Sequence, residues 1–247
     1  MGYSEINAVG IIPSRYNSSR FPGKPLADID GKSMVQRVFE QACKTKFLAQ
    51  VFVATDDERI YNHVKSFTDN VLMTSENHLN GTERVAETIE ILEKRNFYFD
   101  IVANIQGDEP YIHPQQIDET ISVLIKNDNA DIATLVKKIN YEDARDHNRV
   151  KVVLGKDNKA LYFSRQIIPF SKEPEKKEYL KHIGLYVFRT GILRKIIKLE
   201  LSPLEQSENL EQLRWLENGY SIYVDYSNYQ TISIDTREDL KNIKNQL

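Results

Sequence analysis

Apolar runs alternate with amphipathic runs along the first half of the chain. Strand-like apolar runs occupy residues 7–13, 50–55, 70–74 and 100–107, and helix-like runs begin near Ser33, Asp57, Thr82 and Pro114. Alternation of this kind is typical of a mostly parallel sheet that is flanked by helices on both faces. Because the apolar runs contain few polar residues, we expect their strands to be buried on both sides.

The pattern changes after about residue 130, where strands follow one another closely. Strands are predicted at 130–139, 150–154, 160–164 and 181–189, with a charged segment at 171–179. Helices follow near 191–198 and 207–217, then strands at 220–226 and 230–234 and a helix from Thr236. We expect one α/β domain over residues 1–247, with an inserted antiparallel β lobe over residues 131–219.

Composition narrows the choice of function and location. The chain is 40% hydrophobic and 28% charged, which is ordinary for a globular protein, and its net charge is -3. That balance offers no basic footprint for nucleic acid. No apolar run approaches the roughly 20 residues of a membrane span, and the first residues lack signal-peptide features. The single cysteine fits a reducing compartment. We therefore expect a cytoplasmic protein with no nucleic-acid or membrane partner.

Three cations, Arg15, Arg20 and Lys24, follow the end of the first predicted strand. Open α/β sheets bind ligands beyond the carboxyl ends of their strands. Arginine presents a planar fork to phosphate oxygens and lysine a point charge, and Ser18 and Ser19 add hydroxyl donors. The alternative is a solvated surface loop. The segment matches neither the Walker A pattern nor GxGxxG, so a phosphate site here would be of another kind.

Acidic residues follow two further predicted strands. Asp108 and Glu109 come after the strand at 100–107, where Gly107 would let the backbone approach a ligand closely. Mg²⁺ is often held by one or two carboxylates together with substrate phosphates. A helix N-cap is the simpler role for Glu109, and Asp108 stays open between the two roles. Asp235 is a second metal candidate, although its segment also fits an ordinary helix start.

Other polar residues have ordinary structural roles as their first interpretation. Arg84 would be a surface charge, His182 a half-buried structural histidine in a strand, and Glu211 and Gln212 solvated helix residues. None of them identifies a site by itself.

The segments are more specific together than apart. In order and spacing, "IIPSRYNSSRFPGKPLADIDGKSMVQRV", "VFVATDDERI", "MTSENHLNGTERVAE", "NIQGDEP", "ALYFSRQIIPF", "KHIGLYVFR", "SPLEQSENLEQLRWLENG" and "IDTREDL" resemble the 3-deoxy-manno-octulosonate cytidylyltransferases, or CMP-Kdo synthetases. The resemblance extends from about residue 9 to residue 240. It implies a Rossmann-like, nucleotide-diphospho-sugar transferase-like fold and a Mg²⁺-dependent transfer of CMP from CTP to the acid sugar Kdo, releasing pyrophosphate. It also implies a homodimer joined through the lobe and a role in lipopolysaccharide biosynthesis.

The resemblance also assigns site residues. The metal would be held by Asp108 and Asp235, which with Arg15 and Lys24 form the catalytic set. The nucleotide would be bound by Pro13, Arg15, Arg20, Lys24, Thr55, Asp56, Gly81, Arg84 and Gln106. The sugar would be bound by Gln106, Arg165, His182, Tyr186, Glu211 and Gln212, with Gln106 where the nucleotide and the sugar meet.

Two positions depart from the family pattern. Ser233 stands where the family often has glycine, two residues before Asp235, and Ser14 stands where alanine is usual. Because Ser233 bears on the choice of sugar, the alternatives are the same chemistry on 8-amino-Kdo or on another acid sugar. A non-catalytic nucleotide- or sugar-binding protein on this fold is a further alternative.

Overall fold

The computed structural model describes residues 7–18, 20–229 and 232–244, and the chain forms two compact units. Unit 1 comprises Met1–Asp118 with Tyr229–Leu247, and unit 2 comprises Glu119–Asn228. Within the described residues, no helix is long and apolar enough to cross a bilayer.

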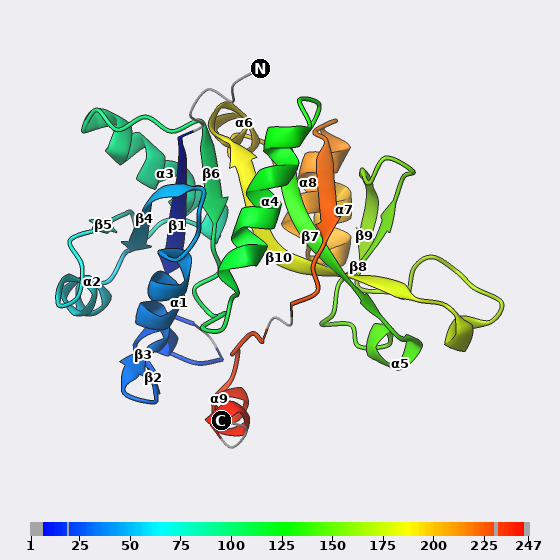
Figure 1. Cartoon of the computed structure of the whole chain (residues 1–247), viewed down its shortest axis with the longest axis horizontal. Coiled ribbons are helices and arrows are strands. Elements are labelled where there is room, and N and C mark those ends of the chain that lie inside the picture. The colour runs from blue at the N-terminus through cyan, green and yellow to red at the C-terminus, as the bar shows by residue number, and fades with distance from the viewer. Residues whose placement is uncertain (1–6, 19, 230–231, 245–247) are drawn as a thin grey trace. The chain divides into compact units, whose positions relative to one another are not determined.

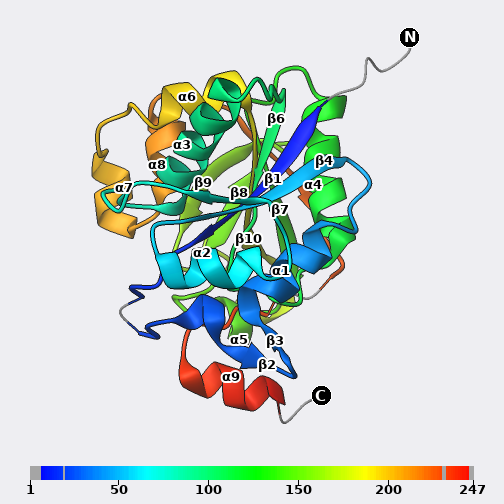
Figure 2. The ribbon, with the colours of Figure 1, turned by 90° about the vertical axis from the view of Figure 1, so that its left-hand side faces the viewer.

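Unit 1 is built on a parallel sheet in the order β6-β1-β4-β5. Its strands are β1 (Ala8–Ser14), β4 (Leu48–Thr55), β5 (Val71–Met73) and β6 (Ile101–Asn104). Figure 2 shows α1 (Met34–Ala42) and α2 (Glu58–Lys65) on one side of β1 and β4, and α3 (Gly81–Lys94) on the other. The side chains of Val9, Ile11 and Ile12 in β1 have no exposed surface, as expected for a strand covered on both faces.

Short polar side chains set the first turns of these helices. The Ser33 hydroxyl accepts a hydrogen bond from the backbone N–H of Gln36, and the Asp57 carboxylate accepts one from that of Arg59. Asn80 does the same for Glu83 at the start of α3. These caps satisfy backbone donors that have no partner inside the helix. Helix starts predicted near Ser33, Asp57 and Thr82 are therefore confirmed to within two residues.

The remaining elements of unit 1 surround the loop after β1. They are the short helix η1 (Lys24–Leu26), the hairpin of β2 (Asp28–Ile29) and β3 (Lys32–Ser33), and the C-terminal helix α9 (Arg237–Lys244). Phe21, Ile29, Met34 and Ile234 form a buried cluster beneath them. This cluster fastens the segment before α9 to the loop after β1. Helix α4 (Pro114–Lys126) begins in unit 1 and continues into unit 2.

Unit 2 has a mostly antiparallel sheet. Its strands are β7 (Ile132–Ile139), β8 (Lys151–Leu154), β9 (Ala160–Ser164), β10 (Tyr179–Arg189) and β11 (Ile222–Tyr226). Strand β10, the long yellow strand in Figure 1, pairs antiparallel with β7 and β8, and β8 pairs antiparallel with β9. Only the β11–β7 pair is parallel in this sheet as described. The helices are α5 (Tyr141–Ala144), η2 (Pro174–Lys176), α6 (Thr190–Ile196), α7 (Pro203–Glu208) and α8 (Glu211–Glu217).

The predicted α/β class, with a mostly parallel sheet flanked by helices, is confirmed. The parallel strands are those of unit 1, which α1, α2 and α3 flank on two sides.

Two predicted elements differ from the structure. The helix expected at 207–217 is two helices, because Asn209 adopts a left-handed conformation (φ 52°) that ends α7 and turns the chain before α8. The strand expected at 230–234 is wrong where it is described. Residues 232–234 have no regular structure, and residues 230 and 231 lie outside the described part.

The chain leaves unit 1 through α4 and returns at Tyr229. The rings of His113, just before α4, and Tyr229 stack with centroids 3.8 Å apart and planes inclined by 10°. The two passages of the chain therefore meet within unit 1.

Candidate functional site

A cavity of about 430 Å³ lies in unit 1 at the carboxyl ends of β1 and β6. It is lined by Pro13, Ser14, Arg15, Asn17, Ser18, Arg20, Lys24, Pro25, Gly81, Arg84, Gln106, Gly107, Asp108 and Asp235. Four of the lining side chains are cations and two are carboxylates, so the cavity favours an anion larger than one carboxyl group. Its place in the sheet is where open α/β folds bind ligands.

The loop after β1 is folded back on itself by a tight turn. The Gly23 N–H donates to the Tyr16 carbonyl over 2.8 Å, and the Lys24 N–H donates to the Phe21 carbonyl over 3.1 Å. Gly23 has φ +73°, a conformation that favours glycine, and a Cβ there would make a tight contact of 3.2 Å with the Tyr16 ring. The turn brings three cations of the loop to one cavity. Ser18 lines it too, whereas Ser19 lies outside the described residues.

The three predicted cations have different environments. Arg15 is exposed, and its Nη1 lies 3.5 Å from the carbonyl oxygens of His78 and Leu79. Arg20 is also exposed and pairs with the Asp235 carboxylate at 3.2 Å. The Lys24 ammonium is largely enclosed, with 13% of its side chain exposed. Two exposed guanidinium groups and one largely enclosed ammonium therefore face the same space.

Asp108 projects from the turn that follows β6. Its backbone carbonyl accepts a hydrogen bond from the Ile234 N–H over 2.9 Å, which places Asp235 beside it. Gly107 is needed for packing at this turn, because a Cβ there would lie 2.9 Å from the Pro13 carbonyl oxygen. The N-cap role considered for Glu109 is wrong, since α4 begins only at Pro114.

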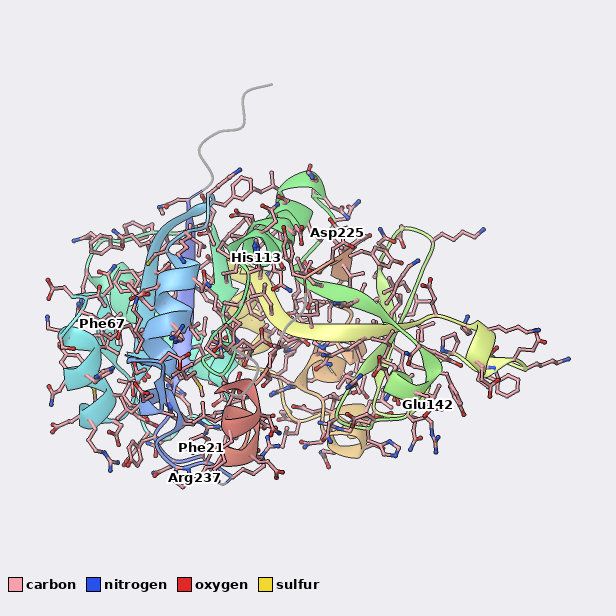
Figure 3. The ribbon with its side chains drawn as sticks, turned by 60° about the horizontal axis from the view of Figure 1, so that its bottom comes forward. Phe21, Phe67, His113, Glu142, Asp225 and Arg237 are labelled. Atoms are coloured by element: carbon pink, nitrogen blue, oxygen red, sulfur yellow. The ribbon has the colours of Figure 1, made fainter. Side chains whose placement is uncertain are left out.

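Asp235 is held by the start of α9. The Asp239 carboxylate accepts hydrogen bonds from the N–H groups of Asp235 and Thr236, over 3.0 and 2.8 Å, and the Thr236 hydroxyl accepts one from the Asp239 N–H. The Arg237 guanidinium lies over the Phe21 ring, 4.8 Å from its centroid (Figure 3). The sequence left this segment open between a metal ligand and a helix start. In the structure it is a helix start, and that helix start fixes the backbone of Asp235, the candidate metal ligand.

The two carboxylates converge on one ammonium group. The Lys24 Nζ lies 2.8 Å from Asp108 Oδ2 and 3.3 Å from Asp235 Oδ1. The described residues hold no group of three or more His, Cys, Asp or Glu side chains that would form a closed metal site. Two carboxylates facing an anion-binding cavity are instead the donor set that suits Mg²⁺ carried by a polyphosphate. The residues present therefore fit that metal.

Arg84 is not the surface charge that its segment suggested. It is fully buried, and its Nη2 pairs with Asp56 Oδ2 at 2.7 Å while its Nη1 donates to the Thr74 hydroxyl. Thr55, at the end of β4, is also buried. Arg84 reaches the cavity wall, whereas Thr55 and Asp56 are not among the lining residues. Asp56 thus acts on the cavity through the orientation of Arg84.

Arg165 lies just after β9 in unit 2 and is held by backbone carbonyls. Its Nε donates to the Glu208 carbonyl over 2.8 Å, and its Nη1 and Nη2 donate to those of His147 and Asn209, each over 3.2 Å. The Glu208 carboxylate accepts from the Arg165 N–H and from the Ser164 hydroxyl. Arginine has five N–H donors, and within the described residues three of those of Arg165 make these hydrogen bonds, which leaves two for a ligand.

His182 and Tyr186 lie together on β10. The His182 ring is 5.2 Å from the Tyr186 ring, and its Nε2 is 3.0 Å from the Thr134 hydroxyl. Burial lowers the pKa of His182 to about 3, with Lys181 adding to the effect, so this histidine is neutral at pH 7. Burial and the nearby Glu211 raise the pKa of Tyr186 well above its usual value. The Tyr186 hydroxyl is buried and has no hydrogen-bond partner among the described residues.

Glu211 and Gln212 open α8, directly after the break at Asn209. Gln212 is buried rather than solvated, and the Glu211 carboxylate lies 3.5 Å from Arg214, which also pairs with Glu205 at 3.0 Å. The structure thus brings the residues predicted for the sugar into unit 2, apart from Gln106, which lines the cavity of unit 1.

Sequence reasoning missed some cavity residues. Asn17 and Pro25 line the cavity but were not singled out, and Ser14 was noted only as a departure from a pattern. The Ser14 hydroxyl is buried and has no hydrogen-bond partner in the described part of the chain. Proximity to the three cations in sequence was the available signal for all of these residues.

Comparison with known proteins finds relatives over most of the chain. Residues 9–225 match the family model described as Cytidylyltransferase. The 3-deoxy-manno-octulosonate cytidylyltransferases of Parabacteroides distasonis and Bacteroides thetaiotaomicron are 49% and 48% identical to the chain, each alignment covering 94% of this chain and 95% of the relative.

A solved structure gives the same picture. CMP:2-keto-3-deoxy-manno-octonic acid synthetase complexed with CTP superposes with a TM-score of 0.91 at 38% identity, over 97% of this chain and 98% of the other. With the match to the family model and the two relatives, this likeness places the protein in one group: the chain belongs to the 3-deoxy-manno-octulosonate cytidylyltransferase family.

Proposed function

We propose that this protein transfers CMP from CTP to the anomeric hydroxyl of Kdo and releases pyrophosphate, as a step of lipopolysaccharide biosynthesis. The observation that carries the proposal is the cavity in unit 1, where Arg15, Arg20 and Lys24 meet Asp108 and Asp235. The likeness to a synthetase solved with CTP supports it.

The cations of the cavity bind the triphosphate. Arg15 and Arg20 are exposed and present guanidinium groups that suit phosphate oxygens in a two-pronged manner, while Lys24 supplies a point charge. The reaction brings two anions together, a triphosphate and a sugar carboxylate. Positioning and charge neutralisation by these side chains therefore supply much of the catalysis.

Asp108 and Asp235 hold Mg²⁺ in this proposal. Their carboxylates converge beside the phosphate-binding cations, and the Ile234–Asp108 hydrogen bond and the α9 cap fix their backbone. A Mg²⁺ ion held by these two carboxylates would neutralise charge on the triphosphate and would lower the barrier to ionising the attacking hydroxyl. We assign no side chain as the general base.

The residues of unit 2 bind the sugar. Arg165 offers two N–H donors to the carboxylate, and His182, being neutral, serves as a hydrogen-bond partner rather than a counter-charge. The buried Tyr186 hydroxyl is suited to a sugar hydroxyl, because a buried polar group without a partner is costly and a ligand would supply one. The buried Gln212 amide is assigned to the sugar by the family resemblance. The family resemblance also assigns Gln106, which lines the cavity of unit 1, to the sugar.

We also propose that the enzyme works in the cytoplasm as a homodimer. The single cysteine is compatible with a reducing compartment, and the family resemblance supports the dimer. Light scattering after size-exclusion chromatography distinguishes a dimer from the mass of one chain, 28.7 kDa.

The experiment that tests the function measures pyrophosphate release from CTP and Mg²⁺ with three sugars offered separately: Kdo, 8-amino-Kdo and a sialic acid. We expect turnover with Kdo and little with the others. Preference for 8-amino-Kdo would keep the chemistry and move the question of sugar choice to Ser233, which is exposed two residues before Asp235. Silence with all three sugars would overturn the proposal in favour of a non-catalytic protein.

A further inference from the structure

Lys24 occupies the place between the two carboxylates that a metal ion would need. Its ammonium contacts Asp108 Oδ2 at 2.8 Å and Asp235 Oδ1 at 3.3 Å, and Arg20 contacts that same Asp235 oxygen at 3.2 Å. Oxygens of both candidate metal ligands are therefore already paired with cations. The proposed function explains why these cations are present, but not why Lys24 contacts both carboxylates.

We propose that Lys24 makes metal binding conditional on nucleotide binding. In the free protein its ammonium holds the metal's place, and the triphosphate draws it away so that a divalent cation enters between Asp108 and Asp235. This inference rests on the proposed function, because it takes the two carboxylates as the metal ligands. It adds an order to the binding events that the set of residues alone does not imply.

Electrostatics makes the two states mutually exclusive. Two carboxylates that share a site repel one another and need a cation between them. The Lys24 side chain is only 13% exposed and that of Asp108 26%, so solvent screens their pairing weakly. A divalent cation in the same place would face the ammonium at contact distance. It therefore has to displace Lys24, and the free energy of the existing ion pairs is subtracted from its affinity.

A nucleotide removes this obstacle because it offers Lys24 other oxygens. The backbone of Lys24 is fixed, since its N–H donates to the Phe21 carbonyl and its own carbonyl accepts from Ala27. The flexible four-carbon stem is the part that is able to move, and the ammonium is a strong partner for phosphate. Coupling of this kind is reciprocal in the binding free energies, typically with a factor of about 5–150 in each affinity.

Arg15 provides a matched control. It carries the same charge and lines the same cavity, but it contacts the carbonyls of His78 and Leu79 rather than either carboxylate. Removing Arg15 changes the general potential of the cavity and leaves the place between the carboxylates occupied. Removing Lys24 changes the general potential of the cavity and also empties the place between the carboxylates.

The test measures Mn²⁺ binding to the nucleotide-free protein by the loss of the free-ion signal in electron paramagnetic resonance. It compares wild type with Lys24→Gln, Lys24→Arg and Arg15→Gln, with circular dichroism and thermal unfolding as checks on the fold. We expect Lys24→Gln to bind Mn²⁺ about fivefold or more tightly than wild type. Lys24→Arg, which keeps the charge, stays as weak as wild type, and Arg15→Gln changes the affinity by less than about twofold because its charge is screened.

Three results would overturn the inference. The first is unchanged or weaker Mn²⁺ binding by Lys24→Gln. The second is an equal gain in Lys24→Gln and Arg15→Gln, which would show a general effect of cavity charge. The third is a gain in Lys24→Gln that survives the addition of Asp235→Asn, which would place the metal elsewhere.

The outcome is separable from that of the proposed function, because the measurement requires neither CTP nor sugar. If wild type is active and Lys24→Gln shows no gain in Mn²⁺ affinity, this inference alone is overturned. A gain in Lys24→Gln with no pyrophosphate release by wild type would sink the proposed function and leave the metal site and its occupant standing.

Discussion

The candidate site residues of unit 1 and unit 2 differ in how they are held. In unit 1 the exposed Arg20 and the largely enclosed Lys24 form ion pairs with the partly exposed carboxylates of Asp108 and Asp235. In unit 2, His182, Tyr186 and Gln212 are buried and uncharged at pH 7. The first arrangement suits a ligand with many charges, and the second a ligand recognised by shape and hydroxyl groups.

This difference predicts that substitutions in unit 1 affect activity without affecting folding. Asp108→Asn and Asp235→Asn each remove a proposed metal ligand, and we expect either to lower kcat by about 100-fold or more. The unfolding temperature should stay close to that of wild type, because both side chains are partly exposed. Full activity in either variant would contradict the metal assignment, and a large loss of stability would contradict the comparison.

In unit 2, by contrast, a site residue should govern how stability depends on pH. His182 takes up a proton in the unfolded chain below pH 6.5 but resists it in the native state down to about pH 3, so stability falls as the pH drops through this range. Between pH 7 and pH 5 the loss from His182 is about 2 kcal/mol. Urea unfolding at the two pH values should show a smaller loss in His182→Gln. Equal losses in variant and wild type would show that His182 protonates readily in the folded protein.

A third substitution, Arg15→Ala, tests whether the cavity of unit 1 binds the nucleotide. Arg15→Ala should raise the KM for CTP by about tenfold, because it removes charge-assisted hydrogen bonds to phosphate, and should leave the KM for the sugar unchanged. Steady-state kinetics with each substrate varied in turn makes the distinction. Arg145→Ala is a suitable control, since Arg145 is an exposed arginine of unit 2 paired with Glu142. An unchanged CTP dependence would remove Arg15 from the phosphate site.

The smallest effect is expected from a single oxygen atom. Tyr186→Phe removes a buried hydroxyl that lacks a partner in the described chain, so the variant should be as stable as wild type or more stable by up to about 1 kcal/mol. If the hydroxyl binds the sugar, the KM for the sugar should rise by about fivefold. Thermal unfolding and kinetics together test this pair of effects. A loss of stability with unchanged kinetics would give Tyr186 a structural role.

The same contrast explains what sequence reasoning was able to predict. The helix starts near Ser33 and Asp57, the parallel strands and the polar residues at strand ends depend on local patterns, and the structure confirms them. The burial of Arg84 could not be inferred from its own segment, because its partner Asp56 directly follows β4, 28 positions earlier in the chain. The break at Asn209 was missed because a non-glycine residue in the left-handed conformation gives little warning in the sequence.

The meeting of Asp108 with Asp235 depended on contacts between distant segments. It requires the Ile234–Asp108 hydrogen bond and the cap made by Asp239, and no short window of the chain contains both residues. Order and spacing across the whole chain were needed to connect them. For the sugar residues, local patterns even favoured the wrong environment, since Gln212 is buried although a helix position of that kind is commonly solvated.

The stacked rings of His113 and Tyr229 have a consequence for the exchange of the segment between them. His113 lies shortly before the chain leaves unit 1, and Tyr229 is the residue at which it returns. Because the two rings stack, the ends of the segment between them are attached at neighbouring positions of unit 1. Segments attached in this way are the ones that tolerate exchange. Under the proposed function, exchange of residues 119–228 would change the residues assigned to the sugar and leave the residues that line the cavity of unit 1 in place.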